Sequence, residues 1–162
     1  MPRRFPPLLQ SPRAQWLAAI GGRYIDGKKL RAGHITDESG PIDLILEAAG
    51  IPSLDFDLLD PLAINGIYVL TGIPGGKRPL EVDGGNLMRT LVLKNQLMFG
   101  SVNASPEHYR MAVADLVSAQ LRWGKLVEQL ITHRHRPEDF SPVFLVHPSD
   151  EIKAVIEWNG TV

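Results

Sequence analysis

Cysteine is absent from this 162-residue sequence, and its absence excludes disulfide bonds and thiolate ligands to zinc. Long apolar runs are absent as well, because none approaches the ~20 residues that a membrane-spanning helix requires. The formal net charge is only −1, so the composition provides no basic surface of the kind that binds nucleic acid. We therefore expect a globular, cytoplasmic protein with neither nucleic acid nor a membrane as partner.

A glycine-rich phosphate-binding loop is also missing, since no Gly-x-Gly-x-x-Gly stretch occurs. The segment 72–78 contains glycines and a lysine, but it fails the P-loop spacing. Thr71 stands where the first glycine is required, and Arg78 stands where Ser or Thr should follow the lysine. Pro79 then follows in place of a helix start. We interpret this segment as a loop at a strand end that lies near a cofactor.

Strand-like and helical segments alternate along the rest of the sequence. Apolar runs between turn residues predict strands at 24–26, 42–47, 67–70, 97–100 and 151–158. Periodic leucines and capping residues predict helices at 12–20, 52–62, 83–94, from 106 onward and at 123–131. This alternation predicts the α/β class, with a parallel sheet of the doubly wound type that lacks its first strands and its glycine-rich loop.

Three predicted strands end in small residues: at 47–50, at 70–75 and at 99–103. Ligands of open α/β sheets bind just outside the carboxyl ends of the strands, so we predict one shared nucleotide-binding edge. Asn103 is the best polar candidate at this edge. A contact to a ligand and a turn residue that caps the strand are equally open interpretations of it.

His133 and His135 lie on the same side of a predicted polar strand, at a spacing that invites a metal site. A site needs a third ligand, and the flanking Arg134 and Arg136 disfavour a cation, so we predict no metal ligands here. Neither a Gly-x-Ser-x-Gly elbow nor a distinctive Ser–His–Asp set occurs, and we assign no catalytic residue.

Several short segments resemble, in order and in spacing, the C-terminal half of the glucose 1-dehydrogenases of the zinc-dependent medium-chain dehydrogenase superfamily. The resemblance covers nearly the whole chain beyond about Ala14. The segments are 42–50, 62–66, 71–76, 81–83, 93–103, 107–109 and 152–157. The resemblance implies a Rossmann-type fold and an oxidoreductase that transfers hydride from the C1 of an aldose to NADP or NAD. The domains it implies are an irregular arm at 1–11, the C-terminal part of the NAD(P)-binding domain at 12–150, and a closing strand and tail at 151–162.

The resemblance also implies roles for particular residues. Thr71, Gly72 and Ile73 would line the nicotinamide side of the cofactor cleft, together with Ser101, Val102 and Asn103. Asn103 would also reach a hydroxyl of the sugar substrate. Arg3 and Arg4 would pair with the 2′-phosphate of NADP.

The departures from the family pattern shape the functional hypotheses. Ala49 stands where the family usually has Thr, and the phosphate loop and the zinc-bearing domain are missing. We expect a truncated chain that is inactive as it stands and becomes active only when complemented. The alternative is a non-catalytic α/β module that self-associates through an open sheet edge, giving a homo-oligomer.

Overall fold

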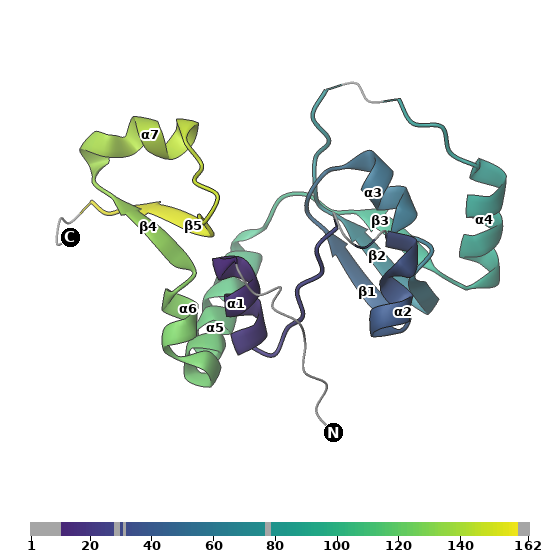
Figure 1. Cartoon of the computed structure of the whole chain (residues 1–162), viewed down its shortest axis with the longest axis horizontal. Coiled ribbons are helices and arrows are strands. Elements are labelled where there is room, and N and C mark those ends of the chain that lie inside the picture. Colours follow the sequence, from purple (N-terminus) through teal and green to yellow (C-terminus); the bar gives the residue numbers. More distant parts are fainter. Residues whose placement is uncertain (1–10, 28–29, 31, 77–78, 159–162) are drawn as a thin grey trace. The chain divides into compact units, whose positions relative to one another are not determined.

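The structure is a computed structural model that describes residues 11–27, 30, 32–76 and 79–158. Residues 25–104 form one compact unit, and the segments before and after them form a second (Figure 1). No helix in the described ranges is long and apolar enough to cross a membrane.

The middle unit is built on a parallel sheet of three strands, in the order β1 (Ile42–Glu47), β2 (Leu62–Leu70) and β3 (Leu97–Gly100). Glu47 is in register with Leu70, and Leu70 is in register with Gly100, so the three carboxyl ends lie at one edge. Figure 1 shows the strands with α3 (Pro52–Asp57) and α4 (Gly84–Leu93) in the connections between them. The predicted α/β class and its parallel sheet are confirmed.

Three expectations in this part of the chain are wrong. The helix predicted over 52–62 ends at Asp57, because Leu62 already pairs with Ile42 as the first residue of β2. Asn65, predicted to form a turn before the strand, lies inside β2 at a φ of 61°, beside a register shift in the β1–β2 pairing. The strand predicted at 24–26 does not form, since no described strand pairs with it. A short 3-10 turn, Ala32–His34, and α2 (Ile35–Ser39) precede β1 instead.

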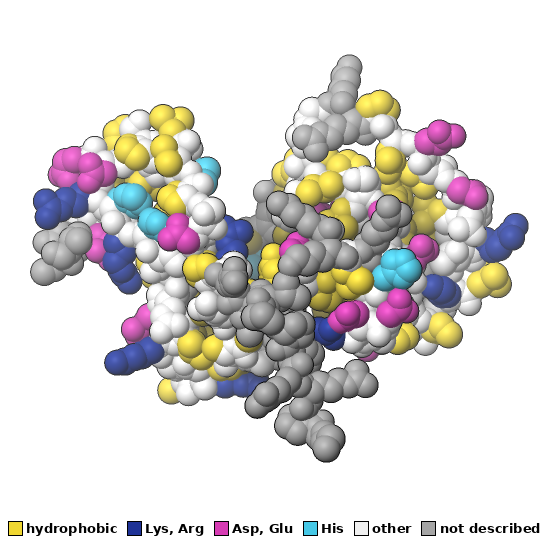
Figure 2. All heavy atoms as spheres, viewed as in Figure 1, with side chains coloured by type: hydrophobic (Ala, Val, Ile, Leu, Met, Phe, Trp, Pro, Cys, Tyr) yellow, Lys and Arg dark blue, Asp and Glu magenta, His cyan; other side chains and the backbone are white. Residues whose placement is uncertain are grey.

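The core of this unit lies on one face of the sheet. Ile45, Leu59, Leu62 and Tyr68 are buried together, with partly buried Leu87 of α4 packed against them. The residues of β1 alternate in burial toward its end, and Leu44 and Leu46 are 62% and 66% exposed. Figure 2 shows hydrophobic side chains at the surface of this unit.

The second unit combines the first helix with the last third of the chain. α1 (Pro12–Ala19) begins as predicted, with the Ser11 side chain accepting a hydrogen bond from the amide of Ala14. α5 (Pro106–Trp123) also begins as predicted, and Nδ1 of His108 accepts the amide of Ser105 at 3.0 Å. A cap and a proline at the first helical position therefore located both helix starts.

The remaining elements of this unit follow α5. The helix predicted at 123–131 is reduced to α6 (Lys125–Glu128), because Ile131 belongs to β4 (Ile131–His135). A 3-10 turn at Pro137–Asp139 leads into α7 (Phe140–Leu145). β5 (Lys153–Ile156) then pairs in parallel with β4, within the closing strand that was predicted.

Candidate functional site

The ends of β2 and β3 bring the predicted cofactor residues together. Ser101, directly after β3, donates its amide to the carbonyl of Leu70 at 2.9 Å. Thr71–Ile73 and Ser101–Asn103 therefore leave the sheet from adjacent strands at its carboxyl edge. Ile73 and Val102 are 79% and 69% exposed, and Asn103 adopts a φ of 71°. The positive φ suits a turn residue, but it leaves the amide side chain of Asn103 available to a ligand.

Glu47, the last residue of β1, connects the turn after β1 to the segment after β2. Its side chain is almost fully buried, and its Oε1 accepts the amides of Ala49 at 2.5 Å and Gly50 at 2.6 Å. Its Oε2 accepts the amide of Gly72 at 3.2 Å. Its carbonyl oxygen accepts the amide and the hydroxyl of Thr71 at 2.8 and 2.7 Å. One residue thus fixes both the turn after β1 and the segment after β2.

Two further buried polar residues surround Glu47. Asp55 of α3 is 7% exposed, and Tyr68 of β2 is fully buried. Burial, followed by the charge of Glu47 and the hydrogen bond to it, raises the pKa of Asp55. Burial also raises the pKa of Tyr68, and the charges of Asp55 and Glu47 add to that effect. Asp55 Oδ1 and Tyr68 Oη have no hydrogen-bond partner among the described residues.

This cluster was not identified from the sequence. The sequence does contain a signal for the burial of Asp55. Asp55 lies one helical turn before Leu59, so a helix would place both residues on the same face. The predicted leucine face instead placed Leu54 inward, and Leu54 is 36% exposed. Of the other predicted residues, Arg3 and Arg4 lie outside the described residues.

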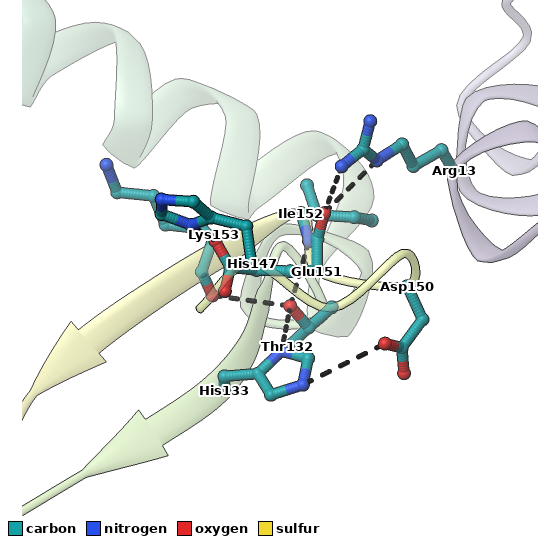
Figure 3. Close-up of polar contacts among 8 residues, drawn as sticks. All are labelled: Arg13, Thr132, His133, His147, Asp150, Glu151, Ile152 and Lys153. Atoms are coloured by element: carbon teal, nitrogen blue, oxygen red, sulfur yellow. Dashed lines mark hydrogen bonds and ion pairs between the residues drawn. The ribbon is translucent and has the colours of Figure 1, made fainter. Parts of the chain in front are cut away.

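The histidine pair lies in the other unit. The rings of His133 and His135 stack with their centroids 6.4 Å apart. Figure 3 shows His133 between the hydroxyl of Thr132, 3.0 Å from its Nδ1, and the carboxylate of Asp150, 4.0 Å from its Nε2. Within the described ranges, no three His, Asp or Glu side chains converge as a metal site would require.

The polar contacts around this pair join α1 to the segment before β5, which pairs in parallel with β4. Figure 3 shows the guanidinium of Arg13 donating to the carbonyl of Glu151, while the amide of Ile152 donates to Thr132 Oγ1 at 2.9 Å. His147 lies 3.3 Å from the Glu151 carboxylate. Because these partners are backbone atoms and surface ion pairs, we interpret the group as a structural connection within this unit.

A cavity of about 140 Å³ lies between α3 and α4, away from the strand-end residues. Phe56, Leu59 and Leu87 line it, together with Gln96, whose buried Oε1 has no partner among the described residues. The Nε2 of Gln96 donates to the carbonyls of Leu62 and Ala63 at 2.8 and 3.1 Å, so this side chain anchors the start of β2.

A parallel sheet with small residues at adjacent strand ends defines the class of open α/β proteins that bind ligands at a carboxyl edge. Residues 8–158 match the protein family described as "Glucose dehydrogenase C-terminus". The chain therefore belongs to this glucose dehydrogenase family of oxidoreductases, within the zinc-type medium-chain dehydrogenases, as the resemblance implied.

Relatives and solved structures agree with this assignment. The chain is 37% identical over 150 residues to glucose 1-dehydrogenase of Thermoproteus tenax, a match that covers 91% of this chain and 40% of that protein. It is 34% identical over 133 residues to glucose 1-dehydrogenase of Halobacterium salinarum, covering 82% of this chain and 36% of that protein.

Among solved structures, Haloferax mediterranei glucose dehydrogenase in complex with NADP, Zn and gluconolactone matches with a TM-score of 0.82 and 30% identity. The match covers 99% of this chain and 43% of that one. The chain thus spans about 40% of the length of the curated relatives it matches.

Proposed function

We propose that this chain supplies the nicotinamide side of the NADP-binding cleft of an aldose 1-dehydrogenase, which transfers hydride from the C1 of a sugar to NADP. The observation that supports the proposal is the juxtaposition of Thr71–Ile73 and Ser101–Asn103 at the ends of adjacent parallel strands. The Haloferax mediterranei relative, solved with NADP and gluconolactone, favours the same cofactor and substrate class.

The residues at this edge fit the nicotinamide end of a dinucleotide. The exposed apolar side chains of Ile73 and Val102 offer packing surface to a planar ring, and the nearby backbone provides polar groups for its carboxamide. Asn103 would bind a sugar hydroxyl, and Arg3 and Arg4 would pair with the 2′-phosphate that distinguishes NADP from NAD.

The residues do not fit the family's zinc ion, because the sequence has no cysteine and no ligand cluster forms in the described ranges. We therefore derive no zinc-dependent step from this chain. The Gly-x-Gly-x-x-Gly sequence that would hold the pyrophosphate is also missing. We propose that the chain by itself is inactive and that sugar oxidation requires complementation by a segment carrying both features.

The experiment is a titration of the ¹⁵N-labelled chain with NADPH, followed by amide NMR shifts. We expect the shifts to concentrate at Thr71–Ile73 and Ser101–Asn103, and the variant Ile73→Asp to weaken binding. Ile64→Asp is the matched control, because Ile64 is 69% exposed and lies near the other end of β2. Shifts elsewhere, or equal weakening by both variants, would contradict the proposed cleft.

A second candidate function is self-association through the open edge of the sheet. In the described part of the chain, β1 pairs only with β2 and so has an unpaired edge. Its Leu44 and Leu46 side chains are exposed next to that edge. We propose this edge as a contact between copies, and light scattering would measure it. Leu44→Lys should reduce the mass to that of a monomer, whereas Leu121→Lys, 84% exposed on α5, should leave it unchanged.

A further inference from the structure

The polar groups of the buried residues Glu47, Asp55 and Tyr68 make none of the proposed cofactor contacts. Carboxyl groups are almost never fully buried unless they are paired, so two of them in one core require a reason. Their location provides one. Glu47 ends β1, Tyr68 lies near the end of β2, and Asp55 approaches from α3.

The segment that Glu47 holds is one of the two segments of the proposed cleft. Glu47 accepts two hydrogen bonds from Thr71 and two from Gly72, counting both its carbonyl oxygen and its side chain. Gly72 in turn lies so close to Gly50 that a Cβ on Gly72 would lie 2.2 Å from the Gly50 nitrogen. A shift of the Glu47 carboxylate would therefore move Gly72, and Ile73 with it.

Asp55 is buried close enough to Glu47 that the charge of Glu47, after burial itself, raises the pKa of Asp55. The Glu47 side chain accepts hydrogen bonds from three backbone amides, which occupy both of its carboxylate oxygens. The ionisable groups that influence one another here are Glu47 from β1, Asp55 from α3 and the phenol of Tyr68 from β2. None of the three supplies a positive charge that would favour a second carboxylate.

We propose that Glu47 is a positioning residue that fixes Thr71–Ile73 at the carboxyl edge, with Asp55 buried beside it. The role of that segment as the nicotinamide wall rests on the proposed function, whereas its immobilisation by Glu47 does not. Glu47→Gln places an NH₂ group against at least one backbone amide donor and breaks the arrangement. Asp55→Asn leaves the Glu47 side chain and its three amide donors in place.

The test measures amide hydrogen exchange and amide shifts of the ligand-free chain by NMR. We expect exchange at Gly72 to rise at least about tenfold in Glu47→Gln and to stay near the wild-type rate in Asp55→Asn. We also expect the Gly72 and Gly50 amide shifts of the wild type to titrate with Asp55 and to lose that titration in Asp55→Asn. Asp43→Asn is the control for charge, since Asp43 is exposed on the same strand.

Unchanged exchange at Gly72 in a folded Glu47→Gln variant, or an equal effect of Asp43→Asn, would overturn the proposal. If Glu47→Gln does not fold, Glu47→Asp replaces it, because the shorter acid retains the charge but cannot reach Gly72. NADPH is then added to each folded variant. Loss of binding in the Glu47 variant alone supports both proposals, whereas no binding in the wild type, with the exchange result intact, refutes only the cofactor role.

Discussion

Gly72 and Gly50 lie against each other, with the Cβ position of Gly72 only 2.2 Å from the Gly50 nitrogen and 2.6 Å from Glu47 Oε2. No side chain fits at Gly72 unless the backbone moves. The contact joins the turn after β1 to the segment after β2, and it sets the position of Ile73 at the proposed cleft.

Replacement of Gly72 by Ala should therefore destabilise the chain by about 1–3 kcal/mol, the usual cost of overpacking. Gly75→Ala is the matched control in the same loop, because its Cβ would meet nothing within 4 Å and its φ is not positive. Urea unfolding measures both variants. Equal midpoints would show that the close approach of Gly72 to Gly50 is relieved at no cost.

Asp55→Asn should change the pH dependence of stability. The pKa of Asp55 is raised above its ordinary value of 3.8 in the folded chain. Between the unfolded-state pKa and the folded-state pKa, the folded state therefore binds more protons than the unfolded state. The free energy of unfolding of the wild type therefore falls as the pH rises through the folded pKa. The variant should lack that fall, and its free energy of unfolding should exceed that of the wild type at mildly alkaline pH. Urea midpoints across the pH range measure this, and parallel curves would contradict it.

Tyr68→Phe should raise the free energy of unfolding by about 1 kcal/mol. The ring is fully buried, and its hydroxyl has no hydrogen-bond partner among the described residues, so the substitution keeps the packing and removes an unpaired polar group. Tyr109→Phe, at a side chain that is 67% exposed on α5, should change nothing. A comparable loss of stability in Tyr68→Phe would indicate that the hydroxyl is hydrogen-bonded, for example through water.

Substitutions of Asn103 should separate its two interpretations. At a φ of 71°, Asn103→Ala should cost about 1 kcal/mol of stability, while Asn103→Gly should be tolerated. A role in substrate binding predicts that Asn103→Gly still raises the KM for the sugar in an enzyme reconstituted with the missing segment. A wild-type KM in that variant, with stability lost only in the Ala variant, would assign Asn103 to the turn.

Local signals in the sequence predicted much of the fold. Ser11 and Ser105, each followed by a proline, located the starts of α1 and α5, because a helix start is decided by groups within one turn. The apolar runs at β1 and β3 were located for a similar reason, since turn residues bound them on both sides. The resemblance to glucose dehydrogenases rested on the order of such segments, and the family match confirms it.

Other features depended on partners distant in the sequence. The segment at 24–26 has strand-like residues but no described neighbour to pair with, and Leu62 joins β2 because Ile42 is opposite it. Asp55 is buried beside Glu47, although the two residues belong to different elements. Strand pairing and buried polar contacts are interactions between segments, so a local pattern cannot determine them.

The sequence by itself thus determined the α/β class, the helix starts and the small residues at the strand ends, because each depends on neighbours along the chain. The tertiary structure decided that Glu47 holds Gly50 and Gly72 together and that Asp55 and Tyr68 are buried beside it. The physical reason is that parallel pairing brings the ends of β1 and β2 to one edge, where a single carboxylate can accept hydrogen bonds from both connections.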